Sequence, residues 1–239
     1  MNLNFDGSTR MSNLHFIGGE KGGVGKSLVA RILAQYLIDH GLPFTGYDTD
    51  KSHGALLRFY AGYASPVVVD DINSLDRIVE AAAAAPEQRI LVDLAAQTQH
   101  ALAQWIEDSG LIELAPDVGM SMTYWHVMDT GRDSVDLLRA WLDRFGGRMP
   151  LVLVQNALRG DRFDLLDASG ERARAERMGA KVISIGRLQD ATMQKIDERS
   201  ASFWAAIHQT DGATLGMLER QRVKVWLARA YAQIATLRI

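Results

Sequence analysis

The most constraining feature of this sequence is the glycine-rich segment Lys-Gly-Gly-Val-Gly-Lys-Ser at residues 21–27. An apolar run at 14–18 precedes it, and apolar residues at helical spacing follow it. A glycine loop between a strand and a helix is typical of a phosphate loop, because glycines let the backbone approach phosphate oxygens closely. The positive end of the following helix further favours an anion.

Two side chains of this loop have chemical roles in a phosphate site. Lys26 can reach the β- and γ-phosphates, and the Ser27 hydroxyl can bind Mg²⁺. The common pattern G-x4-G-K-[ST] is not met, since Glu20 stands where its first glycine belongs. The predicted nucleotide-binding residues are Gly22, Gly23, Val24, Gly25, Lys26, Ser27, Leu28 and Asn156.

The rest of the chain alternates short apolar runs with longer helical patterns, which predicts βαβ units and a mostly parallel sheet. Strands are expected at 14–18, 43–48, 66–69, 89–94, 120–128, 150–154 and 181–185. Helices are expected at 26–40, 72–85, 99–108, 133–145 and 214–236. We expect a polar tail at 1–12 and one α/β P-loop domain at 13–239, with helices on both faces of the sheet.

Composition excludes several other classes of site. Cysteine is absent, which rules out disulfides, iron–sulfur clusters and thiolate zinc sites. No run approaches the roughly 18–20 apolar residues of a membrane span, and the first residues lack the apolar core of a secretory signal. We therefore expect a cytoplasmic protein without integral membrane association, which would lie on the nucleoid if it binds DNA.

The pattern K-G-G-x-G-K-[ST] that this loop does meet resembles the ParA/MinD family of deviant-Walker P-loop ATPases. Lys21 carries the resemblance. In that family the matching lysine reaches across a dimer interface to the partner's phosphates, so Lys21 is a predicted catalytic residue. The resemblance implies ATP and Mg²⁺ as cofactors and a homodimer that forms with ATP.

Two carboxylate motifs stand where the resemblance requires them. Asp48-Thr49-Asp50 ends a strand and resembles the family's first switch, in which Asp50 would orient the attacking water or its Mg²⁺ shell. We expect Asp48 to support the loop by hydrogen bonding. Where partition members of the family have Asp-Pro-Gln, this chain has Lys51-Ser52-His53.

The second motif is an apolar strand ending in Asp93, a Walker B pattern in which the carboxylate binds a Mg²⁺-bound water or accepts from Ser27. The predicted metal-site residues are Ser27, Asp50 and Asp93. Residues 94–98 would form the second switch, in which Gln97 contacts either water or a partner chain. Asn156 resembles the asparagine that reads adenine. Ile185-Gly186-Arg187 replaces the family's proline beside the base.

The charge is distributed unevenly. Residues 1–130 carry a net charge of −8 and residues 131–239 carry +5. Basic residues near Arg174 alternate with Glu171 and Glu176, which indicates a solvated helix with ion pairs, or else a nucleic-acid contact. For the terminal helix, we weigh docking on the domain against a membrane-surface or a DNA-facing role.

The first interpretation of function is an ATPase that dimerises with ATP and positions DNA, in plasmid partition, stability or mobilisation. It would bind duplex DNA without sequence preference, and a small DNA-binding or adaptor protein would stimulate its slow hydrolysis. The second is a MinD-like positioning ATPase at a membrane. A third, from another class, is a P-loop ligase resembling dethiobiotin synthetase, in which Lys21 has no evident task.

Overall fold

The structure is a computed structural model, and it describes residues 11–19, 21–50, 54–69, 71–210 and 215–239. Most of the expected polar tail, residues 1–10, lies outside the described residues. So do Glu20 and the segment Lys51, Ser52 and His53, on which two of the departures from family patterns fall.

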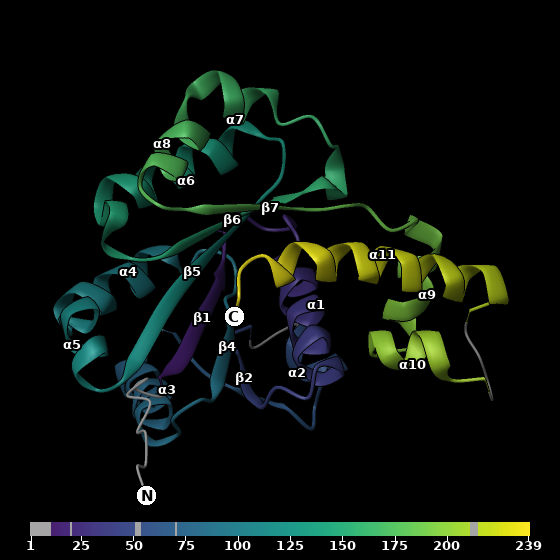
Figure 1. The fold of residues 1–239 in the computed structure, drawn as a ribbon, viewed down its shortest axis with the longest axis horizontal. Coiled ribbons are helices and arrows are strands. Elements are labelled where there is room, and N and C mark those ends of the chain that lie inside the picture. Colours follow the sequence, from purple (N-terminus) through teal and green to yellow (C-terminus); the bar gives the residue numbers. More distant parts are fainter. Residues whose placement is uncertain (1–10, 20, 51–53, 70, 211–214) are drawn as a thin grey trace, which may run out of the picture.

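The described residues form one seven-stranded sheet in the order β3-β2-β4-β1-β5-β6-β7 (Figure 1). Each neighbouring pair is parallel, which confirms the predicted α/β class. The strands are β1 Ser12–Gly18, β2 Phe44–Asp48, β3 Ala64–Pro66, β4 Arg89–Asp93, β5 Met120–Met128, β6 Leu151–Asn156 and β7 Lys181–Ile185.

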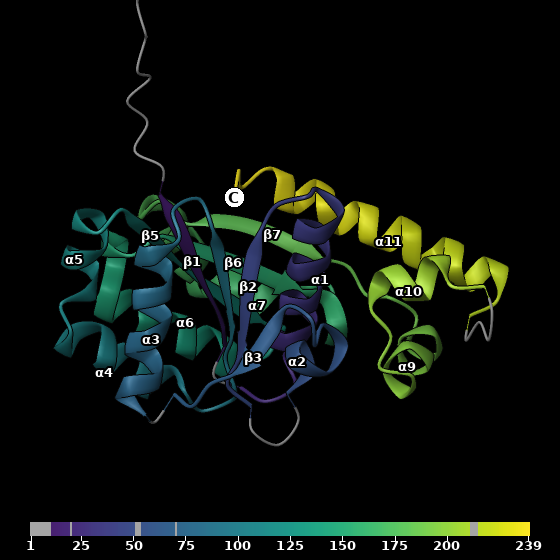
Figure 2. The ribbon, with the colours of Figure 1, turned by 90° about the horizontal axis from the view of Figure 1, so that it is seen from below.

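Helices cover both faces of the sheet, as predicted (Figure 2). One face carries α1 Lys26–Asp39, α2 Ala55–Phe59, α9 Asp190–Glu198, α10 Phe203–His208 and α11 Met217–Ala235. The other carries α3 Ile72–Ala84, α4 Gln99–Asp108, α5 Leu111–Asp117, α6 Arg132–Phe145, α7 Asp164–Ser169 and α8 Glu171–Arg177. Two short 3₁₀ turns, η1 Gly146–Arg148 and η2 Ala157–Arg159, follow α6 and β6.

Each face of the sheet has its own hydrophobic core, because alternate residues of a strand point to opposite faces. In β1, Leu14 and Phe16 pack under α3 and α4, whereas Ile17 packs under α1. Trp141 and Trp226 are buried in the two cores, as the helical spacing predicted. The apolar face of α11 is likewise buried against the domain.

The differences from the predicted elements are local. The third strand lies at Ala64–Pro66 rather than 66–69, and the sixth extends to Asn156. The helices α2, α5, α7, α9 and α10 were not predicted. They have five to nine residues and each buries only one or two side chains in all, so their periodic pattern is too short to detect.

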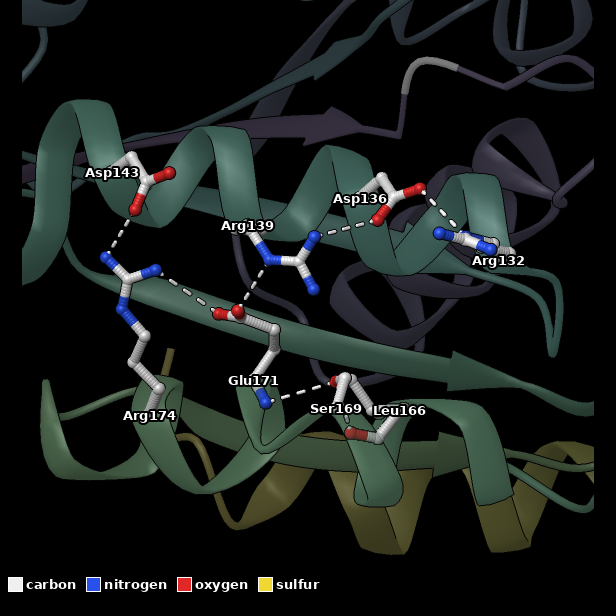
Figure 3. A network of polar contacts seen from close by, with 8 residues as sticks. All are labelled: Arg132, Asp136, Arg139, Asp143, Leu166, Ser169, Glu171 and Arg174. Carbon is white, nitrogen blue, oxygen red and sulfur yellow. Dashed lines mark hydrogen bonds and ion pairs between the residues drawn. The ribbon is translucent and has the colours of Figure 1, made fainter.

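Ion pairs join α6 to α8, as Figure 3 shows. Glu171 accepts from Arg139 at 2.8 Å and from Arg174 at 3.3 Å, and Arg174 also lies 2.6 Å from Asp143. Arg139 continues the network to Asp136 at 2.9 Å. The expectation of a solvated helix with ion pairs is therefore confirmed for this basic cluster.

The pH dependence of stability should reveal the histidine buried at the centre of β1. His15 is 2% exposed and accepts a hydrogen bond from Trp125 Nε1 at 3.2 Å. Burial, with the nearby charge of Arg89, lowers the pKa of His15 to about 4. Only the unfolded chain takes up this proton between pH 6.5 and 4, so this group's stabilising contribution is lost as the pH falls through that window.

At pH 5 the expected loss is about 2 kcal/mol. The fall in unfolding free energy between pH 7 and pH 5, measured by urea denaturation, should therefore be smaller by about that amount in His15→Asn. His208→Asn, in which the replaced side chain is exposed, is the control and should keep the wild-type difference. An identical pH dependence in wild type and His15→Asn would contradict this account of the buried histidine.

Candidate nucleotide-binding site

The site lies at the carboxyl ends of the central strands, where ligands bind in open α/β sheets. The parallel register pairs Ile17 of β1 with Asp93 of β4, and Asp93 with Asp48 of β2. On the other side, Gly18 pairs with His126, so β5 ends close to the loop that leaves β1. The glycine loop is thus flanked by strand ends that carry carboxylates.

The glycine loop has the strained backbone that a phosphate cradle needs. Gly23 and Gly25 have φ angles of +78° and +92°, which other residues rarely adopt. Gly22 has no left-handed φ, and a Cβ added there would meet nothing within 4 Å, so the backbone conformation itself requires glycine only at 23 and 25 of this loop. Lys26 begins α1, is 7% exposed, and donates to the carbonyl of Lys21 at 3.1 Å.

The end of β6 braces this loop from the side. The buried Asn156 donates through Nδ2 to the carbonyl of Val24 at 2.8 Å. A Cβ added at Gly25 would overlap that same Nδ2 atom. The Asn156 Oδ1 atom is buried and has no hydrogen-bond partner among the described residues. Asn156 therefore holds the loop with one end of its amide and keeps an acceptor available at the other.

Two cavities meet at the loop. One, of about 310 Å³, is lined by the loop together with Asp50, Asp93 and residues 94–96. The other, of about 400 Å³, lies between Asn156 and α9. Leu28, near the start of α1, lines both cavities, so they adjoin beside the loop. A further cavity of about 360 Å³, between α1, α2 and α10, shares no lining residue with these two.

Asp93 is the least satisfied group of the site. It is 2% exposed, and neither carboxylate oxygen makes a hydrogen bond of ordinary geometry among the described residues, although the Ser27 hydroxyl is close enough to act on it. Burial, reinforced by the carboxylate of Asp48, raises the pKa of Asp93 to about 8, although the Ser27 hydroxyl and the charge of Lys26 oppose the shift. A buried carboxylate with so weak a donor requires a cation to be stable in its charged form.

The donor set fits Mg²⁺. Asp93, Asp50 and Ser27 offer carboxylate and hydroxyl oxygens around one cavity, the ligands that this ion prefers. The described part of the chain contains no group of three or more His, Asp and Glu side chains that could hold a metal. Mg²⁺ commonly takes only one or two carboxylates and completes its shell with water and substrate phosphates.

The loops after β2 and β4 are tied together. Asp48 accepts from the backbone N–H groups of Asp50 and Leu57, each at 3.0 Å, which confirms its predicted supporting role. The Thr49 hydroxyl accepts from Ala95 N at 2.7 Å, and Thr49 N donates to the carbonyl of Asp93 at 3.0 Å. The middle residue of the Asp-Thr-Asp motif, to which we assigned no role, therefore joins the two predicted switch segments.

The chain is similar in sequence to known proteins. No family model matches it. Protein MobD of Acidithiobacillus ferrooxidans is 24% identical over 216 residues, which cover 88% of this chain and 93% of MobD. Protein TraL of Escherichia coli is 29% identical over 131 residues, 53% of this chain and 54% of TraL. The similarity to these two proteins, together with the parallel sheet, supports the resemblance to ParA-like P-loop ATPases.

Two solved structures resemble the fold more loosely. A nucleotide-binding protein from Archaeoglobus fulgidus in complex with ADP has a TM-score of 0.47 at 15% identity, covering 78% of this chain and 86% of that chain. A plasmid partition protein from Borrelia burgdorferi has a TM-score of 0.45 at 11% identity, covering 91% of this chain and 99% of that chain.

The lysine that marks ParA-like proteins is held by carboxylates of its own chain. Lys21 Nζ lies 3.4 Å from Asp129 Oδ2 and 3.6 Å from Asp133 Oδ2. That Lys21 extends to the phosphates bound by a partner subunit remains a prediction. Burial alone would raise the pKa of Asp129, but hydrogen bonds from Ser134 and Gly131 and the charge of Lys21 outweigh it and hold this pKa below its usual value.

Sequence reasoning missed both Asp129 and a second cation beside it. Arg159 Nη1 lies 3.7 Å from Asp129 Oδ2, and a Cβ added at Gly23 would come within 2.7 Å of Arg159 Nη2. Asp129 directly follows the apolar strand β5, just as Asp93 ends β4, so the strand-end position could have revealed it. No local pattern singles out Arg159, whose place depends on the path of η2.

The bracing contact at Gly25 can be tested without nucleotide. In Gly25→Ala the new Cβ would overlap Asn156 Nδ2 at a left-handed φ, so we expect the unfolding free energy to fall by about 1–3 kcal/mol. Gly22→Ala is the matched control, because its Cβ meets nothing within 4 Å, and it should change stability by less than about 0.5 kcal/mol. Urea denaturation measures both, and equal losses would argue against the brace.

Proposed function

We propose that this chain is an ATPase that dimerises when it binds ATP and Mg²⁺, and that the dimer positions DNA with a small DNA-binding or adaptor protein as partner. The observation that carries the proposal is a braced phosphate loop beside the buried carboxylate of Asp93, which makes no hydrogen bond of ordinary geometry within the described residues. The likeness to MobD along nearly the whole chain supports the same assignment.

In this proposal the triphosphate lies against the backbone of the loop from Gly22 to Gly25, with Lys26 neutralising its charge. Ser27, Asp93 and Asp50 would hold Mg²⁺, which when bound spreads the charge of the β- and γ-phosphates. The adenine would occupy the cavity beside Asn156, whose unpartnered Oδ1 can accept from the exocyclic amine. That acceptor favours adenine over guanine, which presents a carbonyl at the same position.

Hydrolysis in this proposal depends on Asp50. The residue lines the phosphate cavity, and its backbone N–H donates to Asp48, which fixes its position at the end of β2. Its carboxylate would orient the attacking water. The Thr49 bonds to Ala95 and Asp93 give a direct route by which loss of the γ-phosphate would disturb both switch segments together.

The packing of α11 bears on the alternative membrane function. A membrane-surface helix must present its apolar face, but Val223, Trp226 and Leu227 are buried against the domain. The described residues also include no helix with the length and apolar character needed to cross a bilayer. Because Val223, Trp226 and Leu227 already pack against the domain, we prefer an ATPase that positions DNA to a positioning ATPase at a membrane.

The phosphate assignment is tested at Lys26. Lys26→Met keeps much of the side-chain length but removes the ammonium, so ATP affinity should fall at least about 30-fold, or ~2 kcal/mol. Isothermal titration measures the affinity, and a thermal melt checks that the variant is folded. Lys195→Met, at a partly exposed lysine that pairs with Glu219, is the control and should bind as the wild type does. An unchanged affinity in folded Lys26→Met would rule out this role.

The switching model is tested at Asp50. Association would need bound ATP but dissociation would need hydrolysis, so Asp50→Ala should accumulate as a dimer with ATP and Mg²⁺ while its nucleotide-free form stays monomeric. Sedimentation velocity distinguishes the two states. Asp164→Ala, at an exposed carboxylate on α7, should behave like the wild type. If both wild type and Asp50→Ala stay monomeric at saturating ATP, the dimerisation model is wrong.

A further inference from the structure

The loop that joins β7 to α9 carries an arginine at the position where the family pattern has a proline. The loop consists of Gly186, Arg187, Leu188 and Gln189. Its first three residues line the cavity of about 400 Å³ beside Asn156, to which we assign the base. A guanidinium therefore stands at the wall of the base cavity, in place of an apolar ring.

The backbone on both sides of Arg187 is held by the domain. On one side, the carbonyl of Gly186 accepts a hydrogen bond from Trp226 Nε1 of α11 at 2.6 Å. On the other side, the Leu188 side chain is buried in the hydrophobic core between the sheet and α1. The Arg187 side chain consequently starts from a fixed point of the cavity wall.

The guanidinium of Arg187 is also fixed in orientation, because it is paired with Asp190 at two points. Nε donates to Asp190 Oδ1 at 3.0 Å, and Nη2 donates to Asp190 Oδ2. Two parallel bonds of this kind set the plane of the guanidinium as well as its position. Asp190 lines the same cavity, so a flat ion pair forms part of its wall.

The rest of the lining fits a planar heterocycle. Apolar side chains come from Leu28, Leu158, Leu188 and Met193. Asn156, which is 1% exposed, adds the acceptor Oδ1, for which the described residues supply no donor. Apolar walls with one placed polar atom are typical of sites for ring systems, and a guanidinium plane is a surface on which bases stack.

The charges around this cavity disfavour phosphate. Its lining contains one cation, Arg187, and three carboxylates, those of Asp190, Asp197 and Glu198. Asp197 is paired with Arg31, which is not part of the lining, at 2.8 Å. Because Arg187 is itself engaged by Asp190, the cavity offers a phosphate more repulsion than attraction. Arg187 would therefore meet the base of a nucleotide rather than its phosphates.

We propose that the guanidinium of Arg187, held flat by Asp190, stacks on the face of the base and makes the site selective for purines over pyrimidines. In this arrangement Arg187 determines base selectivity, and Asp190 is a positioning residue that acts through it. The inference rests on the nucleotide site of the proposed function, and it adds a selectivity that the Asn156 acceptor does not supply.

Two different contacts are needed to select adenine. The Asn156 acceptor distinguishes adenine from guanine, but cytosine has an exocyclic amine as adenine does and could also donate to it. Stacking distinguishes these two bases, since the two fused rings of a purine place more atoms against the guanidinium than the single ring of a pyrimidine. Removing Arg187 should therefore reduce the preference for adenine over cytosine.

Isothermal titration with Mg²⁺ and three ligands, namely ADP, CDP and inorganic pyrophosphate, tests the stacking contact. In Arg187→Ala we expect ADP affinity to fall about 10-fold and CDP affinity about 3-fold, while pyrophosphate, which has no base, binds as it does to the wild type. Arg148→Ala is the matched control. Arg148 pairs with Glu113 at 2.8 Å and is 56% exposed, against 53% for Arg187, but it lies far from the cavity in sequence and lines none of it.

Asp190→Asn separates stacking from simple attraction by charge, because the two accounts predict opposite signs. If Arg187 acted on the phosphates through its charge, loss of the Asp190 carboxylate should tighten the binding of ADP. If Arg187 stacks on the base, loss of the fork should weaken ADP binding about 3-fold. Glu113→Gln makes the same kind of change in the control pair and should leave ADP binding unaltered. Tighter ADP binding in Asp190→Asn would overturn the proposal.

Arg187→Lys tests whether the plane of the guanidinium matters. Lysine keeps the positive charge but has neither the flat group nor the fork that Asp190 holds. The ratio of ADP affinity to CDP affinity should fall as it does in Arg187→Ala. A wild-type ratio in Arg187→Lys would mean that charge alone is sufficient, and stacking would be wrong. Both replaced side chains of the pair are more than half exposed, and thermal melts check that each variant is folded.

Failure of this inference is distinguishable from failure of the proposed function. If folded Arg187→Ala keeps the wild-type affinities for ADP and CDP, stacking is wrong but the nucleotide site stands. If the wild type binds pyrophosphate as tightly as ADP, the base cavity and this inference both fall, whereas the phosphate loop, tested separately on Lys26→Met, remains. If the wild type binds none of the three ligands and no ATP, the nucleotide site itself is wrong, and the inference falls with it.

Discussion

The parallel pairing of β1 with β4 on one side and β5 on the other is the constraint on which the rest of this structure depends. Parallel strands end at the same edge, so the pairing sets the glycine loop between Asp93 and Asp129. Both carboxylates are nearly inaccessible to water. A buried carboxylate keeps its charge only beside a cation or hydrogen-bond donors, and Lys21 and Arg159 lie beside Asp129, whereas we propose a metal ion for Asp93.

The two carboxylates are satisfied in different ways. Asp129 is met by Lys21, Arg159, Ser134 and the backbone N–H of Gly131, and of these Ser134, Gly131 and Lys21 keep its pKa low. Asp93 makes no hydrogen bond of ordinary geometry among the described residues, and burial raises its pKa despite the nearby Ser27 hydroxyl. On the Asp129 side of the loop, the protein's own groups satisfy the carboxylate. On the Asp93 side, a bound cation would do so.

The carboxyl ends of β6 and β7 form the side of the site to which we assign the base. Asn156 reaches from β6 to the loop carbonyl of Val24, and the loop after β7 is bonded to Trp226 of α11. The terminal helix is therefore linked to the glycine loop through the Trp226–Gly186 bond, the pairing of β7 with β6, and the Asn156–Val24 bond. The position of the loop that carries Arg187 thus depends on how α11 packs.

The amino-acid sequence alone determined the α/β class, the phosphate loop and the strand-end carboxylates Asp48, Asp50 and Asp93. These features can be recognised from a few neighbouring residues. One is a glycine loop between a strand and a helix, and the other is an apolar run that ends in aspartate. The longer helices were predictable for the same reason. Five short helices were not, because each buries too few side chains to set a period.

The tertiary structure alone decided which distant groups meet. The contacts of Lys21 with Asp129, of Arg159 with Gly23, and of Thr49 with Ala95 join segments that follow different strands of the sheet. It also set Trp226 of α11 against the loop of Arg187. Sequence spacing places Trp226 on the apolar face of its helix, but the loop that this face meets depends on how α11 packs on the sheet, which no local pattern encodes.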